Sequence, residues 1–317
     1  MTELDISLLD GAERLILALR ALYRQYGYTR YRMGKFEEYD LYVENKDFLI
    51  SENVITFTDT DGRLLALRPD VTLSVVKNLG DEPEMLRKLC YSENVYRVSK
   101  GTGSFREIMQ VGLECIGKVD NACVGETLLL AAKSLALCAP SFVLEVSHLD
   151  ILMAFLNEAV GHDATLRAAA LQCVGEKNAS GVAEVCRAGG GRAEELVELL
   201  GLYGPAARIL PKLHALCAGR GLDAELGGLD AALAALQGSG LEDRVQLDFS
   251  SVSNCNYYNG ILFRGFVEGI PDSVLSGGQY DKLMRKVGKQ SGAIGFAVYL
   301  EELVRLDGME SGVRRNA

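Results

Sequence analysis

The sequence predicts an α+β fold in which a single sheet is built from both ends of the chain. Strand-forming segments occupy residues 54–117 and return after residue 244, whereas residues 148–240 are rich in alanine, leucine and glutamate. Glycines divide that middle stretch into short helices. The simplest architecture is a core of residues 1–150 and 245–317 that carries a helical insertion at residues 151–244.

The first predicted element is an amphipathic helix over residues 10–26. Leu15, Leu19 and Leu22 repeat at the spacing of one helical face, so this face is expected to pack on the core. Gly27 follows at the position where a helix favours a left-handed C-terminal cap. The helix is therefore expected to end at or just before this glycine.

A hairpin and a short helix are predicted next. Residues 54–57 and 64–67 are extended stretches, and the turn-rich residues 58–62 between them predict a hairpin loop. Pro69 suits the first turn of a helix, because its missing N–H would have no partner there. We therefore predict a helix that opens at Pro69 and continues through Val76.

The later elements follow from the same periodicities. Two strands are expected between residues 88 and 117, joined by the glycine-containing residues 99–104. The remaining predictions are a helix at 126–137, strands at 142–146, 245–249 and 261–264, and a last helix at about 293–305.

The composition limits the classes of function. A formal net charge of −10 and a pI of about 5.0 provide little of the clustered positive charge that nucleic-acid backbones attract. Acidity does not exclude tRNA by itself, because a local basic patch is enough to bind it. The N-terminus lacks the basic region of a signal peptide, and no apolar run reaches the roughly 20 residues of a membrane span. We therefore expect a cytoplasmic protein without membrane contact.

The cysteines predict neither a metal centre nor a disulfide framework. Eight cysteines are scattered without a Cys-x-x-Cys pair, and the chain has only three histidines. Zinc sites require closely spaced ligand pairs, which this pattern does not offer. Most of the cysteines have apolar neighbours, so we expect reduced thiols in the core.

Four segments resemble the catalytic core of histidyl-tRNA synthetases, which are class II aminoacyl-tRNA synthetases. They occur in the order of that family and together cover about residues 8–306. Each string is short, but the ordered set is specific. The segments are Tyr26-Gly27-Tyr28 with Phe36-Glu37; Leu67-Arg68-Pro69-Asp70-Val71-Thr72; residues 96–114; and residues 256–260 with Gly277-Gly278-Gln279-Tyr280-Asp281 and Gly295-Phe296-Ala297. The resemblance implies a class II synthetase-like antiparallel sheet with helices.

The same resemblance implies a pocket for histidine or a similar cation. Asp70, Thr72 and Gln110 match the residues that hold the α-amino group in the family, and Glu114 and Tyr258 match those that meet the imidazole. A carboxylate opposite an imidazole orients its N–H and favours its protonated form. The full set of pocket residues is Asp70, Thr72, Arg97, Gln110, Glu114, Tyr257, Tyr258 and Tyr280.

A structural interpretation of these residues stays open at this point. Glu114 on a core strand can pair with Arg97, and Tyr257 and Tyr258 can simply fill space with satisfied hydroxyls. A duplicated fold can keep such a pocket only as scaffold.

The residues that bind adenine in the family are replaced here. Ile108 stands at the position of the aromatic ring, and Glu302 at that of the arginine, which together sandwich the base. A carboxylate in place of a guanidinium reverses the charge beside the triphosphate. Tyr299 replaces a glycine that leaves room for the nucleotide. These three changes predict that ATP does not bind.

The phosphate side is only partly retained. Arg97 matches the arginine that holds the α-phosphate, and Arg106 matches the loop arginine. Ser99 replaces a glutamate, and Ser253 replaces an arginine specific to histidyl-tRNA synthetases. A serine hydroxyl in place of this arginine cannot form the two parallel hydrogen bonds that a guanidinium donates to phosphate. We therefore predict no catalytic residues, no cofactor and no amino-acid activation.

We expect neither a nucleotide site nor an anticodon-binding domain, and a synthetase-like chain of this kind is similar to the regulatory subunits of ATP phosphoribosyltransferase. The resemblance implies a non-catalytic subunit that is required for activity of a short catalytic subunit. It also implies histidine feedback in the first step of histidine biosynthesis.

The expected partners are the short catalytic subunit and a second copy of this chain, with histidine as a candidate ligand and without tRNA. Class II cores dimerise through their first motif, where Gly34 here replaces the usual proline. Two alternatives remain. One is a divergent, truncated histidyl-tRNA synthetase or histidine-activating ligase, and the other is a synthetase paralogue that binds another partner.

Overall fold

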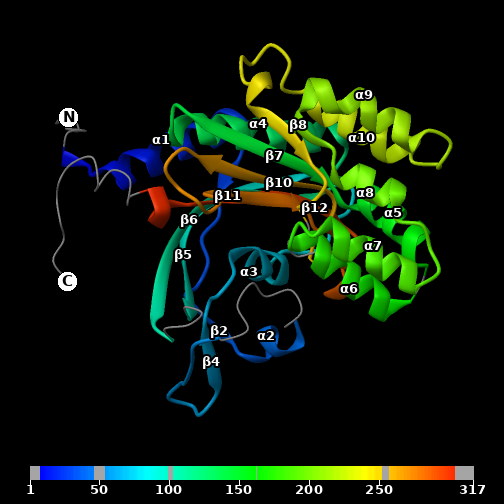
Figure 1. Ribbon diagram of the computed structural model, residues 1–317. Helices are drawn as coiled ribbons and strands as arrows, with labels where there is room; N and C mark the ends of the chain where they lie inside the picture. Colours follow the sequence, from blue (N-terminus) through cyan, green and yellow to red (C-terminus); the bar gives the residue numbers. More distant parts are fainter. Residues whose placement is uncertain (1–7, 46–53, 99–102, 162, 252–256, 304–317) are drawn as a thin grey trace.

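One sheet runs through the protein, and the described residues contribute nine strands to it (Figure 1). The computed structural model describes residues 8–45, 54–98, 103–161, 163–251 and 257–303. In spatial order the strands are β1 (Thr29–Arg30), β5 (Arg87–Val98), β6 (Phe105–Gly117), β12 (Gly292–Tyr299), β11 (Leu275–Gln279), β10 (Asn259–Val267), β7 (Phe142–His148), β9 (Val245–Asp248) and β8 (Tyr203–Pro205). Neighbours are antiparallel except for the pairs β1–β5 and β7–β9, which are parallel.

The two ends of the chain interleave in this sheet. β12 pairs with β6, so that Ala293 lies opposite Ile116, and β10 pairs with β7, so that Phe263 lies opposite Val146. The three strands that follow residue 258 therefore fill the space between β6 and β7. This arrangement confirms the predicted α+β fold with an antiparallel class II synthetase-like sheet.

The N-terminal helix α1 (Gly11–Gln25) agrees with its prediction to within one residue at each end. Its start is fixed by a capping box, in which Asp10 accepts from the Glu13 amide and Glu13 accepts from the Asp10 amide. Gly27 adopts the expected left-handed conformation with φ +85°. Tyr23 is fully buried and lies edge-on to Phe296 of β12, which ties the helix to the sheet.

A separate three-stranded sheet lies away from the main one (Figure 1) and confirms the predicted hairpin. The prediction that Pro69 opens the next helix is wrong by two residues. Asp70 precedes the helix in extended conformation, and its carboxylate accepts from the Leu73 amide at 2.8 Å, so Asp70 is the N-cap. The elements of this region are β2 (Phe36–Glu38), α2 (Asp40–Glu44), β3 (Thr56–Thr58), β4 (Leu64–Leu67) and α3 (Val71–Asn78).

Helix α4 (Asn121–Cys138) is long and apolar enough to cross a membrane by length and composition alone. In this structure, however, 56% of its length is buried, against the sheet, α1 and the insertion helix α10. It therefore serves as a core helix. It begins five residues before the predicted start, because Asp120 caps it by accepting from the Cys123 amide at 2.9 Å.

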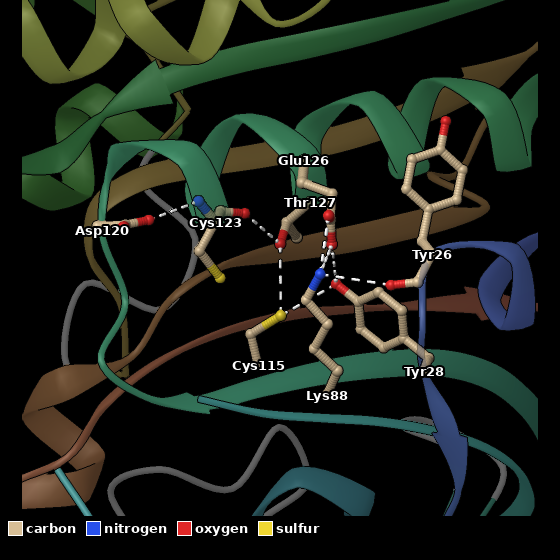
Figure 2. Close-up of polar contacts among 8 residues, drawn as sticks. All are labelled: Tyr26, Tyr28, Lys88, Cys115, Asp120, Cys123, Glu126 and Thr127. Atoms are coloured by element: carbon tan, nitrogen blue, oxygen red, sulfur yellow. Dashed lines mark hydrogen bonds and ion pairs between the residues drawn. The ribbon is translucent and has the colours of Figure 1, made fainter. Parts of the chain in front are cut away.

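A buried polar cluster joins α4 to the sheet (Figure 2). The Tyr28 hydroxyl lies 3.0 Å from the Cys115 sulfur and donates to the Glu126 carboxylate at 3.2 Å. Lys88 on β5 lies 2.8 Å from the same carboxylate, so this half-buried acid is paired. The described cysteines are free thiols, and most are buried as predicted, whereas Cys255 lies outside the described residues.

The predicted insertion, residues 151–244, is not entirely helical. Its strand β8 pairs with β9 at the edge of the main sheet, with Gly204 opposite Leu247. The sequence does not reveal β8, since it has three residues and one of them is Pro205. Figure 1 shows the insertion helices gathered on one side of the molecule. They are α5 (Leu149–Val160), α6 (Ala164–Gly175), α7 (Ala179–Ala188), α8 (Glu194–Leu200), α9 (Ala206–Cys217) and α10 (Asp223–Ala234).

The predicted last helix at 293–305 is wrong over most of its length. Gly292–Tyr299 forms β12, which lies between β6 and β11 in the interior of the sheet. Because both faces of this strand are covered, its apolar residues run without the alternation that marks a half-buried strand. Helical structure begins only at Leu300 and continues to residue 303, the last described residue.

Candidate ligand pocket

All eight residues predicted for the histidine pocket line one cavity of about 440 Å³, its open mouth included. β5, β6, β11 and β12 form its floor, and the N-terminus of α3 forms one wall. Residues more than 180 positions apart in the sequence therefore meet at one site, as the resemblance implied. The cavity is also lined by Tyr91, Ser276, Gly295, Phe296, Ala297 and Tyr299.

The secondary structure explains how these side chains converge. Gln110 and Glu114 are four residues apart on β6, and the two-residue period of a strand places them on the same face. Asp70 and Thr72 lie at the start of α3, where the helix cap fixes their positions. Tyr280 immediately precedes α11 (Asp281–Lys286).

Glu114 is the deepest acid of the pocket, with 1% of its surface exposed. Its two carboxylate oxygens accept hydrogen bonds from different hydroxyls, Thr72 Oγ1 at 2.7 Å and Tyr280 at 2.6 Å. Burial raises the pKa of Glu114 to about 8, although both hydroxyls oppose that rise by stabilising the carboxylate. With its pKa raised to about 8, Glu114 is mostly protonated at pH 7.

The purely structural role considered for Glu114 required an ion pair with Arg97. That pair is not formed in the described part of the chain. The Arg97 Nε donates to the Pro69 carbonyl at 3.0 Å, and its Nη2 is buried without a hydrogen-bond partner. A buried guanidinium nitrogen without a partner is costly, so this edge of Arg97 could accommodate a ligand carboxylate.

Asp70 supplies a second acid at the opposite side of Thr72. Burial raises the pKa of Asp70, whereas its hydrogen bond from the Leu73 amide and the nearby charge of Arg97 lower it. An ammonium group beside Asp70 would restore its charge, because an opposite charge favours the ionised form. The pocket thus offers acceptors for a cation and a free guanidinium edge for an anion.

Aromatic rings form the remaining wall. The Tyr257 ring lies 4.7 Å from that of Tyr258 and 5.9 Å from that of Tyr280, measured between centroids. Burial raises the pKa of all three hydroxyls well above 10, so they remain donors at neutral pH. The sequence did not place Tyr91 in this wall, and it assigned Tyr299 to the nucleotide site only.

Glycine at position 295 makes room for the acid. A Cβ at Gly295 would lie 1.9 Å from Glu114 Oε2, which no side chain tolerates. Gly295 was predicted to belong to a family motif, but the sequence alone did not indicate that it makes room for Glu114. A glycine inside a strand is a general signal of such a close approach.

On the side of the site where the family binds the nucleotide, the arginine is paired with two acids. Arg106, the loop arginine, lies 2.5 Å from Glu301 Oε1 and 3.7 Å from Glu302 Oε1. The hydrogen bond that Arg106 donates to Glu301 and the charges of both acids raise the pKa of Arg106. Ile108, at the adenine position, is half-buried in the hydrophobic cluster beneath α3. Ser99 and Ser253 lie outside the described residues.

Comparison with known proteins supports this assignment of the fold. The family described as Histidyl-tRNA synthetase matches residues 3–303. A protein of Caldanaerobacter subterraneus subsp. tengcongensis named ATP phosphoribosyltransferase regulatory subunit is 32% identical over 295 residues, which are 90% of this chain and 76% of the relative. The chain belongs to the histidyl-tRNA synthetase-like family of ATP phosphoribosyltransferase regulatory subunits.

Solved structures show the same fold at lower identity. A Bacillus halodurans protein described as an ATP phosphoribosyltransferase regulatory subunit/histidyl-tRNA synthetase superposes with a TM-score of 0.80 at 24% identity, covering 96% of this chain and 83% of its own. A chain of the ATP phosphoribosyl transferase (HisG:HisZ) complex from Thermotoga maritima superposes with a TM-score of 0.72 at 18% identity, covering 92% and 97%.

The two parts of the site that the synthetase resemblance defines therefore differ in this member of the regulatory-subunit family. The eight residues predicted for the amino-acid side line the cavity together, and Glu114 is hydrogen-bonded to Thr72 and Tyr280. On the phosphate side, Glu301 and Glu302 neutralise the arginine that the synthetase resemblance assigns to the nucleotide.

Proposed function

We propose that this chain is a non-catalytic regulatory subunit of ATP phosphoribosyltransferase. It activates a short catalytic subunit and confers histidine feedback on the first step of histidine biosynthesis, in the cytoplasm. The pairing of Arg106 with Glu301 carries the non-catalytic part of the proposal, because it removes a phosphate-binding charge while the amino-acid half persists. The name and the extent of the similarity to the Caldanaerobacter relative support the regulatory part.

Histidine is the proposed ligand of the pocket. Its carboxylate would meet the unsatisfied edge of Arg97, and its ammonium would meet Asp70 and Gln110. Its imidazole would then face Glu114 and Tyr258. Each polar group of histidine thus finds a partner of opposite hydrogen-bonding character, which a buried site requires.

Regulation follows from differential binding to two states. The subunit favours the active conformation of its partner, and histidine shifts that equilibrium by binding one state more tightly. A homodimer of this chain, formed through the first motif around Gly34, is the proposed base of the hetero-oligomer.

Reconstitution with the short catalytic subunit tests the function. Phosphoribosyl-ATP formation from ATP and phosphoribosyl pyrophosphate should require both proteins, and histidine should inhibit it. The Glu114→Gln variant should still activate but should respond less to histidine. Glu107→Gln, on the same strand but outside the cavity, is the matched control. Full activity of the catalytic subunit alone, or failure of the two proteins to co-purify, contradicts the proposal and favours a paralogue with another partner.

Pyrophosphate exchange separates the proposal from a histidine-activating ligase. With ATP and histidine, this chain should catalyse no exchange above the protein-free rate. Robust exchange would mean that Arg106 still engages a nucleotide despite its two carboxylate partners, and the non-catalytic assignment would be wrong.

A further inference from the structure

A second cavity lies where the insertion meets the end of strand β9. It encloses about 790 Å³ of empty space, its open side included, and lies among α6, α7, α8 and β9. Its walls are mainly apolar, with side chains from three helices: Val174, Val182, Val197 and Leu200. A concave apolar site with a few polar groups is the usual form of a small-molecule pocket.

An ion pair supplies the charged groups of this cavity. Lys177 Nζ lies 3.3 Å from Asp248 Oδ2, and both residues line the space. The Asp248 side chain is 2% exposed, whereas that of Lys177 is 64% exposed. Asp248 Oδ1 already accepts from the amide and hydroxyl of Ser250 at 2.8 and 2.6 Å. Oδ2 therefore remains for the lysine and for any ligand.

The backbone of Lys177 is strained. Its φ of +54° is left-handed, and among the described residues it is the only residue other than glycine with a positive φ. A lysine in this conformation costs free energy that a glycine would avoid, and such strain is concentrated at functional sites. The strained turn places the ammonium group at the mouth of the cavity, next to the Asn178 cap of α7.

The charges of the cavity select the ligand. We propose that this cavity binds an α-amino acid with an aliphatic side chain, its carboxylate on Lys177 and its ammonium on Asp248. Opposite charges held 3.3 Å apart are complementary to a zwitterion, whose own charges sit on neighbouring groups. A simple anion would also face Asp248, and a simple cation would also face Lys177. The valine and leucine walls then cover the side chain.

This site is independent of the regulatory function proposed above and differs in chemistry from the first pocket. The first pocket presents tyrosines and two acids to an imidazole, whereas the walls of this one are mainly aliphatic, with Asn178, Tyr203 and Ser250 beside its ion pair. It assigns a role to residues 151–244, the part of the chain for which the synthetase resemblance supplied none.

Calorimetric titration of the full chain with L-leucine tests the proposal. We expect saturable binding with a Kd below about 1 mM. The deaminated acid 4-methylpentanoate and the decarboxylated amine isoamylamine should each bind at least about tenfold more weakly, because each lacks one charge-assisted hydrogen bond. Absence of saturable leucine binding, or equal binding of all three compounds, overturns the proposal.

Variants locate the binding. Lys177→Met keeps the aliphatic stem and should weaken leucine at least about tenfold, whereas Lys212→Met, an exposed lysine on α9, should not change it. Lys177→Gly should weaken binding equally while holding or raising the melting temperature, since glycine relieves the positive φ. Unchanged affinity in both Lys177 variants refutes the site. Loss of leucine binding in Glu114→Ala would instead place leucine in the first pocket and also overturn the proposal.

Discussion

The proton on Glu114 makes histidine affinity depend on pH in a defined way. In the empty pocket Glu114 keeps its proton up to about pH 8, whereas the imidazole of free histidine is neutral above about pH 6.5. The bound pair, a carboxylate facing an imidazolium, contains that same single proton. Binding between about pH 6.5 and 8 therefore needs no exchange of this proton with the solvent, and affinity should be greatest there.

The magnitude follows from proton linkage. Below about pH 6.5 a proton must leave on binding, and above about pH 8 a proton must be taken up, so affinity should fall by up to tenfold for each pH unit on either side. The buried tyrosines do not titrate in this range, because their pKa values are raised well above 10. Asp70, whose pKa is also raised, adds to the fall on the acid side only.

Calorimetry across pH 5.5–8.5 in buffers of different ionisation enthalpy measures both affinity and proton exchange. Glu114→Gln should lose about 1.5–3 kcal/mol of histidine binding and should lack the alkaline fall, because glutamine cannot ionise. The reasoning is refuted if wild-type affinity is flat over this range or if Glu114→Gln follows the wild-type profile.

Three further predictions concern stability and are checked by chemical denaturation. Gly295→Ala should destabilise by about 1–3 kcal/mol, because its Cβ would overlap the Glu114 carboxylate, whereas Gly227→Ala in the exposed face of α10 should stabilise by about 0.5–1 kcal/mol. Arg68→Met should lower the free energy of unfolding by about 3–5 kcal/mol, because the fully buried Arg68 guanidinium binds the Asn94 carbonyl at 2.8 Å and Glu93 at 3.2 Å. The control Arg63→Met, at an exposed arginine, should leave the stability nearly unchanged. The pKa of Glu114 rises from 4.5 to about 8 on folding, so its contribution to the free energy of unfolding is greatest below about pH 4.5. This contribution, up to about 5 kcal/mol, should be lost as the pH rises to about 8, and Glu114→Gln should remove the dependence on pH.

Local patterns were sufficient to predict most elements, whereas the pocket residues were predicted from the family resemblance. Helix α1 carries its period, its cap and its terminal glycine within 18 residues. Gln110 and Glu114 share a face because a strand alternates, whereas the helix cap that fixes Asp70 was not predicted, since the helix was expected to open at Pro69. The ordered motifs then indicate that these separate positions converge.

The features that sequence missed depend on distant neighbours. β12 was mistaken for a helix because it lies in the interior of the sheet and both of its faces are covered. Burial of both faces removes the alternation of apolar and polar residues that identifies a strand. Glu301 holds Arg106 from 195 positions away, and no local pattern relates the two. Gly295 lies against Glu114 only once β12 and β6 have paired in the observed register.

The interleaved sheet has a consequence for synthesis on the ribosome. β6 and β7 emerge early, but the strands that pair with their facing edges, β12 and β10, are translated only after residue 258. Until then, two long hydrogen-bonding edges are unpaired, which is the state in which strands associate with wrong partners. A nascent-chain chaperone, or a pause that delays exposure of these edges, should therefore influence the yield of this protein more than that of chains whose neighbouring strands follow one another in sequence.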